Sequence, residues 1–215
     1  MSFKRRALGL GIVAVVATAG LAANASATSG GHFAISAAHS TIFGTQLNEH
    51  RLEYLFHGLE GGIVCDSAKY EGTATASTVT ELDLRPTYSG CHTTGSATNI
   101  PIHVNGCLFR LTVAPGAEPE QTVDLVCSFG KAIEITHPNC TITILPQASG
   151  GGATYTTTEE IGTHKLTVDA NLQFNVEFHG GICVFTGTNH TGTLAGSMTV
   201  NADTTELKTL DLTAT

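Results

Sequence analysis

The sequence predicts an all-β fold, an antiparallel β-sandwich of about 10–12 short strands. Three observations support this prediction. Apolar and polar residues alternate along most of the chain beyond residue 27, which places one set of side chains in the core and the other in water. Glycine-containing pairs that favour turns separate the alternating runs. No segment beyond residue 27 has a convincing helical period of apolar residues.

The alternating runs give the expected strands in chain order. Their inward apolar residues are Leu52/Tyr54/Phe56, Leu82/Leu84, Ile100/Ile102/Val104, Cys107/Phe109/Leu111/Val113, Val123/Leu125/Cys127/Phe129, Ile133/Ile135, Cys140/Ile142/Ile144, Leu172/Phe174/Val176/Phe178 and Leu194/Met198/Val200. Threonine is abundant, and its β-branched side chain suits the solvent face of a strand. Turns are expected at Gly61-Gly62, Ser89-Gly90, Asn105-Gly106, Gly130-Lys131, Gly150 to Gly152 and Gly180-Gly181. Because the chain has no Trp and few aromatic residues, branched aliphatic side chains should form most of the core.

The N-terminus has the layout of a secretory signal peptide, which we expect to span residues 1–27 with cleavage after Ala27. Basic residues 4–6 precede an apolar stretch, residues 7–23, that is rich in Ala, Gly and Val. The alternative is a transmembrane anchor, but this stretch falls short of the ~20 strongly apolar residues that a spanning helix needs. The mature protein is therefore predicted to be secreted without a transmembrane anchor, by the general or the twin-arginine route.

Removal of the signal peptide would change the net charge from −8 to −11, because residues 1–27 hold three of the ten basic residues and no acidic residue. An acidic surface repels phosphate backbones, so nucleic acid is not an expected partner. The remaining 188 residues are enough to build one well-buried core. We expect residues 28–215 to form a single all-β domain, with the Gly- and Thr-rich segment 147–160 as the only candidate hinge loop.

All six cysteines lie in the predicted mature chain, at Cys65, Cys91, Cys107, Cys127, Cys140 and Cys183. An even number of cysteines in an exported chain predicts three disulfides, although the sequence does not choose among the pairings. A structural zinc site is the weaker interpretation, because the close ligand pairs of such sites are absent. Three of the cysteines share the parity of the core residues, which favours buried disulfides with a stabilising role.

A short motif occurs twice, as FHGLEGGIVC at residues 56–65 and FHGGIC at residues 178–183. In each copy a strand leads into Phe-His-Gly, a Gly-Gly pair and then a cysteine. The simplest interpretation is an internal repeat in which a strand, a tight Gly-Gly turn and a disulfide-bearing strand are reused.

The repeat contains the candidate site residues His57, Glu177 and His179, which the alternation places on the outward face. Glu177 and His179 are two residues apart on one face of a strand, and so could form half of a metal or acid–base site. However, the first copy has Leu55 where the second has Glu177, and no convergent partners are evident. We therefore favour a structural role, in which each histidine ends a strand and bonds a turn carbonyl.

Sequence motifs for common chemistries are absent, including G-x-S-x-G, a P-loop, a dinucleotide fingerprint and an EF-hand loop. No catalytic residue, metal ligand or cofactor is assigned. The leading hypothesis is an exported, non-catalytic protein with an extracellular or envelope binding or structural role and a cell-envelope or polysaccharide ligand. The alternatives are a secreted hydrolase with a spatially assembled carboxylate or histidine site, and a divalent-cation-binding protein.

Two stretches carry a family resemblance, LRPTYSGCHTTGSATNIPIHVNGCLFRLTV at residues 84–113 and TVDLVCSFGKAIEITHPNCTITILPQ at residues 122–147. They resemble segments of a group of uncharacterised exported proteins of soil actinobacteria. The resemblance implies an exported, disulfide-bonded β protein and implies no activity. It also implies the pairings Cys65–Cys91, Cys127–Cys140 and Cys107–Cys183.

Overall fold

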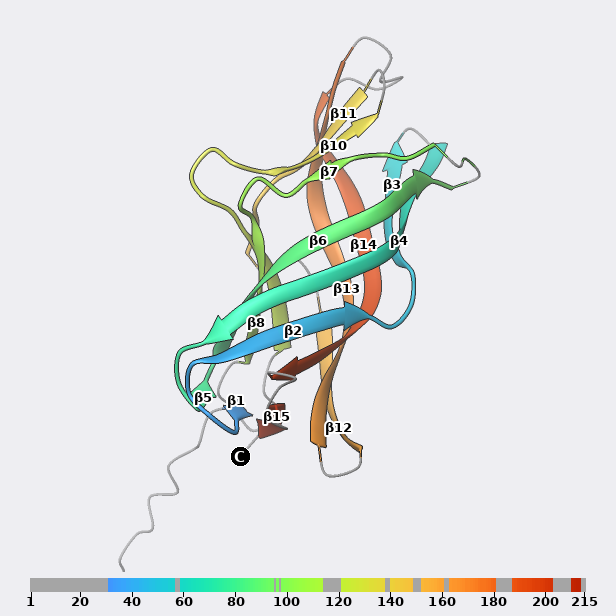
Figure 1. Ribbon diagram of the computed structural model, residues 1–215. Helices are drawn as coiled ribbons and strands as arrows, with labels where there is room; N and C mark the ends of the chain where they lie inside the picture. Colours follow the sequence, from blue (N-terminus) through green and yellow to red (C-terminus); the bar gives the residue numbers. More distant parts are fainter. Residues whose placement is uncertain are drawn as a thin grey trace, which may run out of the picture.

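The computed structural model describes residues 31–56, 59–94, 96, 98–113, 121–137, 140–148, 152–160, 163–180, 187–202 and 210–213 (Figure 1). The predicted signal peptide lies outside these residues. The predicted all-β antiparallel fold is confirmed, because every pairing between the described strands is antiparallel and no helix occurs in these ranges. The described part of the chain accordingly has no helix long and apolar enough to cross a membrane.

The described residues form fifteen strands. These are β1 (His32–Ile35), β2 (Ser40–Gln46), β3 (His50–Phe56), β4 (Leu59–Ala74), β5 (Thr78–Val79), β6 (Glu81–Thr93), β7 (Ile102–His103), β8 (Leu108–Val113), β9 (Gln121–Val126), β10 (Ile133–His137), β11 (Cys140–Ile144), β12 (Ala153–Glu160), β13 (Thr163–His179), β14 (Gly187–Ala202) and β15 (Leu210–Thr213). Four of them, β4, β6, β13 and β14, have 13 to 17 residues and are longer than the short strands expected from the sequence.

The strands form a small sheet, β15-β1-β5, and a large sheet of twelve strands. The large sheet has the order β7-β10-β11-β13-β14-β2-β4-β6-β8-β9, with β12 beside β13, and β3 between β14 and β4. Figure 1 shows β2, β4 and β6 running across the long β13–β14 pair, so that the sheet forms two facing layers. The segment after β11 connects these layers, because the amide of Leu145 donates to Asn175 of β13 at 3.1 Å and Gln147 forms a bridge with Leu125 of β9.

The core lies between the layers and follows the alternation of the sequence. Along β8, Phe109, Leu111 and Val113 are buried, while the intervening residues are partly exposed. The same alternation holds for Leu172, Phe174, Val176 and Phe178 of β13. Burial of such side chains supplies about 1.5–3 kcal/mol each, so the predicted core carries most of the stability of the fold.

Three segments predicted to be turns or loops lie in strands, and one of them, Ser89-Gly90, lies inside β6. Gly61 and Gly62 pair with Tyr54 and Glu53 inside the β3–β4 ladder, so the predicted Gly-Gly turn is wrong in the first copy of the repeat. The pair Phe56–Leu59 is the last of this ladder. The predicted hinge loop 147–160 is largely β12, which pairs with β13 along residues 153–160.

Two other predicted turns are confirmed. Asn105 and Gly106 have φ angles of 53° and 79°, and the amide of Cys107 donates to the carbonyl of Val104 at 2.9 Å. Positive φ at both central residues is the geometry that Asn-Gly favours. In the second turn, Gly130 has a φ of 69° and the amide of Lys131 donates to Ser128 at 2.9 Å.

The disulfides correct two of the three expected pairings. Cys65–Cys91 is present, as expected. However, Cys107 bonds Cys127, so the pairings Cys127–Cys140 and Cys107–Cys183 are wrong. The physical reason is the β8–β9 ladder, in which Leu108 pairs with Val126 and therefore places Cys107 directly opposite Cys127. Cys140 is also disulfide-bonded, and Cys183 lies outside the described residues.

The long β4–β6 pair contains an irregularity that shapes the interior. The buried residues of β4 change parity from Cys65 to Ala68 and Tyr70. The change occurs at Asp66, opposite Gly90 of β6, where Gly90 has a φ of 64° and the Asp66 side chain lies over its Cα. A left-handed residue is tolerated here because glycine has no Cβ. As a result, both Cys65 and Tyr70 face the core although they are five residues apart.

Candidate functional site: a buried histidine between two cavities

The structure places the predicted Glu177–His179 pair on the outer face of the large sheet. The Nε2 atom of His179 lies 3.2 Å from Oε2 of Glu177, and the two side chains are 56% and 23% exposed. His57 lies outside the described residues. Among the described residues, no three His, Cys, Asp or Glu side chains form a group that could hold a metal ion. The described residues thus add no third His, Cys, Asp or Glu to this pair that would complete a metal site.

The strands that carry the two Phe-His-Gly motifs flank the same neighbour. Leu194 of β14 pairs with Leu52 of β3 on one side and with Leu172 of β13 on the other. Both β3 and β13 run antiparallel to β14, so Phe56 and Phe178, the first residues of the two motifs, lie toward the same end of the sheet. Their similarity in sequence thus corresponds to a similar position in the sheet.

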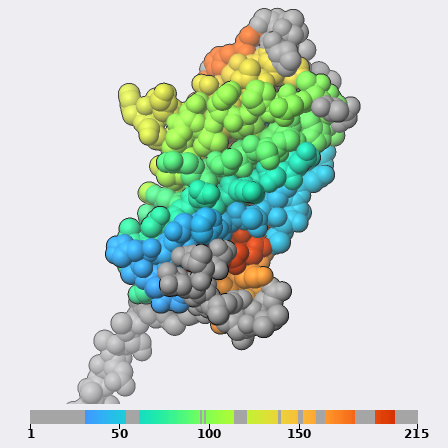
Figure 2. Space-filling model, viewed as in Figure 1, coloured from blue at the N-terminus to red at the C-terminus, as the bar shows by residue number. Residues whose placement is uncertain are grey.

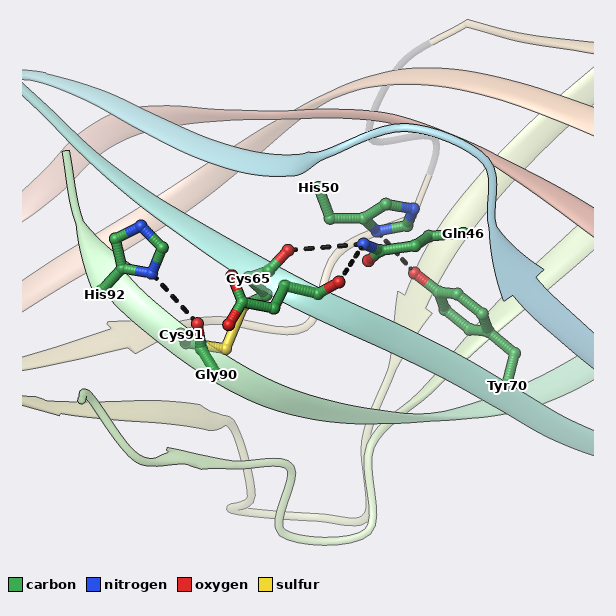
Figure 3. Close-up of a disulfide and its surroundings, with 8 residues drawn as sticks. Gln46, His50, Cys65, Tyr70, Gly90, Cys91 and His92 are labelled. Atoms are coloured by element: carbon green, nitrogen blue, oxygen red, sulfur yellow. Dashed lines mark hydrogen bonds between the residues drawn. A yellow bond between two sulfur atoms is a disulfide. The ribbon is translucent and has the colours of Figure 1, made fainter. Parts of the chain in front are cut away.

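A different histidine, His50, is buried inside the sheet. It begins β3, pairs with Cys65 of β4 and is only 6% exposed. Its Nδ1 atom lies 2.8 Å from the hydroxyl of Tyr70 (Figure 3). Its Nε2 atom lies 3.3 Å from the carbonyl oxygen of Ser197. Tyr70 is also buried, at 3% exposed. Three strands, β3, β4 and β14, thus contribute to one hydrogen-bonded polar network in an apolar core.

Two glycines provide the space for this polar network. A Cβ atom at Gly196 of β14 would lie 2.8 Å from Cδ2 of the His50 ring. A Cβ atom at Gly44 of β2 would lie 3.0 Å from the Cβ of Tyr70. Contacts this short require a neighbour to move, so any side chain at these positions would displace His50 or Tyr70.

Burial also sets the protonation of the network. Burial lowers the pKa of His50 below its ordinary value of 6.5, because the imidazolium form loses hydration, and the bond to Ser197 opposes this only in part. Burial likewise raises the pKa of Tyr70 and of Tyr88. At neutral pH the side chains of His50, Tyr70 and Tyr88 are therefore uncharged.

Two cavities adjoin His50, each with a free volume of about 30 Å³. His50, Phe109 and Leu194 line both of them. Tyr88 lines the first cavity and Tyr70 lines the second, and their other described walls are almost entirely apolar. The free volume exceeds the 10–15 Å³ or so that one water needs, but a water also needs two to four polar partners. The interior therefore suits an apolar molecule with few polar groups.

One further polar atom is unusual. Nε2 of Gln46 donates to the carbonyls of Asp66 and Cys65 at 2.8 and 3.4 Å, beside the Cys65–Cys91 disulfide (Figure 3). Its Oε1 atom is buried and has no hydrogen-bond partner. This is the one such side-chain atom among the described residues.

The sequence analysis assigned no role to His50, although a signal was present. His50 has the same parity as the predicted inward residues Leu52 and Tyr54, so the alternation already places it in the core. Its partners Tyr70 and Ser197 are 20 and 147 residues away, and no local spacing connects them.

Comparisons with known proteins do not assign the site to a family. No protein-family model, no curated protein and no solved structure matches the chain.

Proposed function

We propose that this chain is an exported, non-catalytic binding protein that holds a small molecule in the interior of its curled sheet. The observation that carries the proposal is the pair of cavities on either side of His50. Well-packed cores leave few voids, and an apolar void costs roughly 24 cal/mol per Å³. Because such cavities lower the stability of the fold, their position beside the buried His50 is better explained by ligand binding than by a stabilising role.

The disulfides and the sequence support the exported location. The structure has two disulfides between neighbouring strands, and Cys140 is disulfide-bonded too. Disulfides persist in oxidising compartments, so these bonds are consistent with an extracellular protein. The signal-peptide pattern at residues 1–27 points the same way.

The arrangement of acidic groups favours binding over hydrolysis. Asp83 binds Arg110 through two hydrogen bonds of 2.7 and 2.8 Å, and Glu81 lies 3.4 Å from the same guanidinium. Glu177 lies beside His179 on the outer face. Hydrolysis by paired carboxylates requires them to face one another across a substrate, whereas these groups share one face or one cationic partner.

The proposal is tested by exposing the folded, oxidised protein to pressurised xenon. Xenon binds apolar cavities, so methyl resonances of cavity residues such as Ile135 and Leu194 should shift with saturation. Leu47, which is 59% exposed, is the internal control for non-specific effects. Ala170, which lines the second cavity, can be replaced by Leu to fill it. Absence of saturable shifts at every cavity residue would contradict the proposal.

A second candidate function, binding of an envelope or polysaccharide surface, is favoured by Phe129. Its side chain is fully exposed in the turn that follows the Cys107–Cys127 disulfide, with Lys131 nearby in the chain. Figure 2 shows this segment, in yellow-green, projecting from the body of the molecule. The test is retention of the oxidised protein on insoluble cell wall, chitin and cellulose, with and without EDTA. Retention that Phe129→Ser abolishes would support this function, and equal retention of both proteins would contradict a role for the turn.

A further inference from the structure

We propose that Gln147 closes the entrance to the interior site, and that small apolar molecules enter and leave there when its side chain releases β13. The inference rests on the proposed function, because it assigns the route to the cavities that this function uses. It follows from the way in which the two layers are joined between β9 and β13.

One stretch of β13 has no continuous ladder on the side away from β14. The β12–β13 ladder ends at Ala170, and the β11–β13 ladder begins at Val176. In the described part of the chain, isolated hydrogen bonds replace a ladder along this edge of residues 171–175. One of them is the 3.1 Å bond from the amide of Leu145 to the carbonyl of Asn175.

Gln147 fills this gap and connects it to the other layer. Its Nε2 atom donates to the carbonyl of Gln173, and its Oε1 atom accepts from the amide of Asn175 at 2.7 Å. Its backbone bonds that of Leu125 of β9 in both directions, at 3.0 and 3.1 Å. The side chain thus takes the place of a strand residue for β13, while the main chain takes that place for β9. A single, partly exposed residue therefore bonds both layers at this point.

The residues that Gln147 joins belong to the wall of the first cavity. Leu125 lines this cavity, and so does Phe174, which lies between the two residues of β13 that Gln147 bonds. Ile144, at the end of β11, lines it too. Because Gln147 itself is partly exposed, release of its side chain would open this wall to solvent.

A second contact of β9, with Tyr155 of β12, is harder to open. Tyr155 donates its amide to the side chain of Gln121 and its hydroxyl to the carbonyl of Thr122. However, Tyr155 is buried and its ring packs against Phe33 at a centroid distance of 5.7 Å. Opening there exposes an aromatic ring to water, whereas release of Gln147 moves a polar side chain into water, which replaces much of the lost hydrogen bonding. Local opening uses contacts of the second kind.

The first experiment compares amide hydrogen exchange in the full, oxidised protein and in Gln147→Met. Methionine has a similar length but no amide group, so it loses both side-chain bonds. Exchange at Leu125, whose amide donates to the carbonyl of Gln147, reports the opening. We expect Gln147→Met to raise this rate about 4- to 100-fold, the ratio for two net hydrogen bonds. Gln173→Met is the matched control and should leave the rate unchanged, because Gln173 bonds Gln147 through its backbone carbonyl.

The second experiment connects this contact to the interior site. Relaxation dispersion of the Leu125 and Ile144 methyl resonances at half saturation with xenon gives the rates of xenon entry and exit. Gln147→Met should raise both rates by the same factor and leave the Kd for xenon unchanged, since an entrance changes the barrier and not the bound state. Gln173→Met should change neither rate.

Three results would overturn the inference. The first is equal xenon rates in the unmodified protein and in Gln147→Met. The second is faster xenon exchange in Asn48→Ala alone, because Asn48 bonds Ser197 beside His50, at a different wall. The third needs no variant, and therefore decides the matter if Gln147→Met does not fold. It is that the amides of Leu125 and Leu145 in the unmodified protein are as protected as those of the β13–β14 ladder.

The outcomes separate the inference from the proposed function. Saturable xenon binding with unchanged rates in Gln147→Met would refute this entrance and leave the interior site. No saturable response to xenon, even where exchange at Leu125 is accelerated, would refute the interior site and its entrance together.

Discussion

The buried histidine predicts a specific pH dependence of stability. The pKa of His50 in the folded protein lies below the ordinary value of 6.5, because burial disfavours the charged ring. Between these two pKa values the unfolded chain binds more protons at this residue than the folded protein does. The free energy of unfolding therefore rises with pH in this window. The contribution of neutral His50 is fully present above about pH 6.5 and is lost as the pH falls from there toward the folded-state pKa.

The size of the effect follows from one proton. Linkage of a single group gives a slope of at most about 1.4 kcal/mol per pH unit. At pH 5.5, one unit below the unfolded value of 6.5, the loss is thus up to about 1.4 kcal/mol. With a urea m-value of about 2 kcal/mol per M, the unfolding midpoint should fall by up to ~0.7 M relative to pH 7.5.

The assay is urea unfolding at half-unit steps between pH 5 and pH 8, with His50→Gln as the matched control. Glutamine can accept from Tyr70 and donate to the Ser197 carbonyl, but it does not become charged. Exposed groups titrate in both proteins, so the difference between the two curves isolates residue 50. The reasoning fails if the two midpoints change in parallel across this range.

Three further changes test the structure. Gly196→Ala should cost about 1–3 kcal/mol because the new Cβ would lie 2.8 Å from the His50 ring, and His50→Ala in the same chain should remove most of this cost in a double-mutant cycle of unfolding midpoints. Replacing Cys107 and Cys127 by serine should lower the free energy of unfolding by about 3 kcal/mol, since their sequence separation is 20 residues. Arg110→Met should cost less than about 1 kcal/mol, because its side chain is 34% exposed, and the difference should disappear in 1 M salt.

The alternation of the sequence predicted the strands because it reflects backbone geometry. Successive side chains of a strand point to opposite faces whatever the topology, so the run from Cys107 to Val113 identifies both β8 and its buried face. Strand length was predicted less well. The glycines at 61 and 62 permit a turn but do not force one, and in β4 they take part in the β3–β4 ladder.

The disulfide pairing and the site depend on contacts that local patterns do not encode. Cys107 pairs with Cys127 because of the register of two strands, and a resemblance to other chains gave a different partner. The outward histidines stood out because their motif occurs twice. His50 did not stand out, because its site forms only where β14 and β4 bring Ser197 and Tyr70 to its two nitrogens.

The glycines around this network are the strongest sign that it was selected for a role other than stability. Glycine inside a strand weakens it by roughly 0.5–1 kcal/mol relative to alanine, yet Gly44 and Gly196 both occupy interior strand positions and both make room for the polar network. An apolar residue in place of His50 would fill space without needing a partner, and the two glycines could then carry side chains. Where local preference and global packing conflict in this way, the conflict tends to mark a functional site. The two cavities and Gly196 all adjoin the ring of His50, which makes His50 the residue whose replacement tells most about the protein.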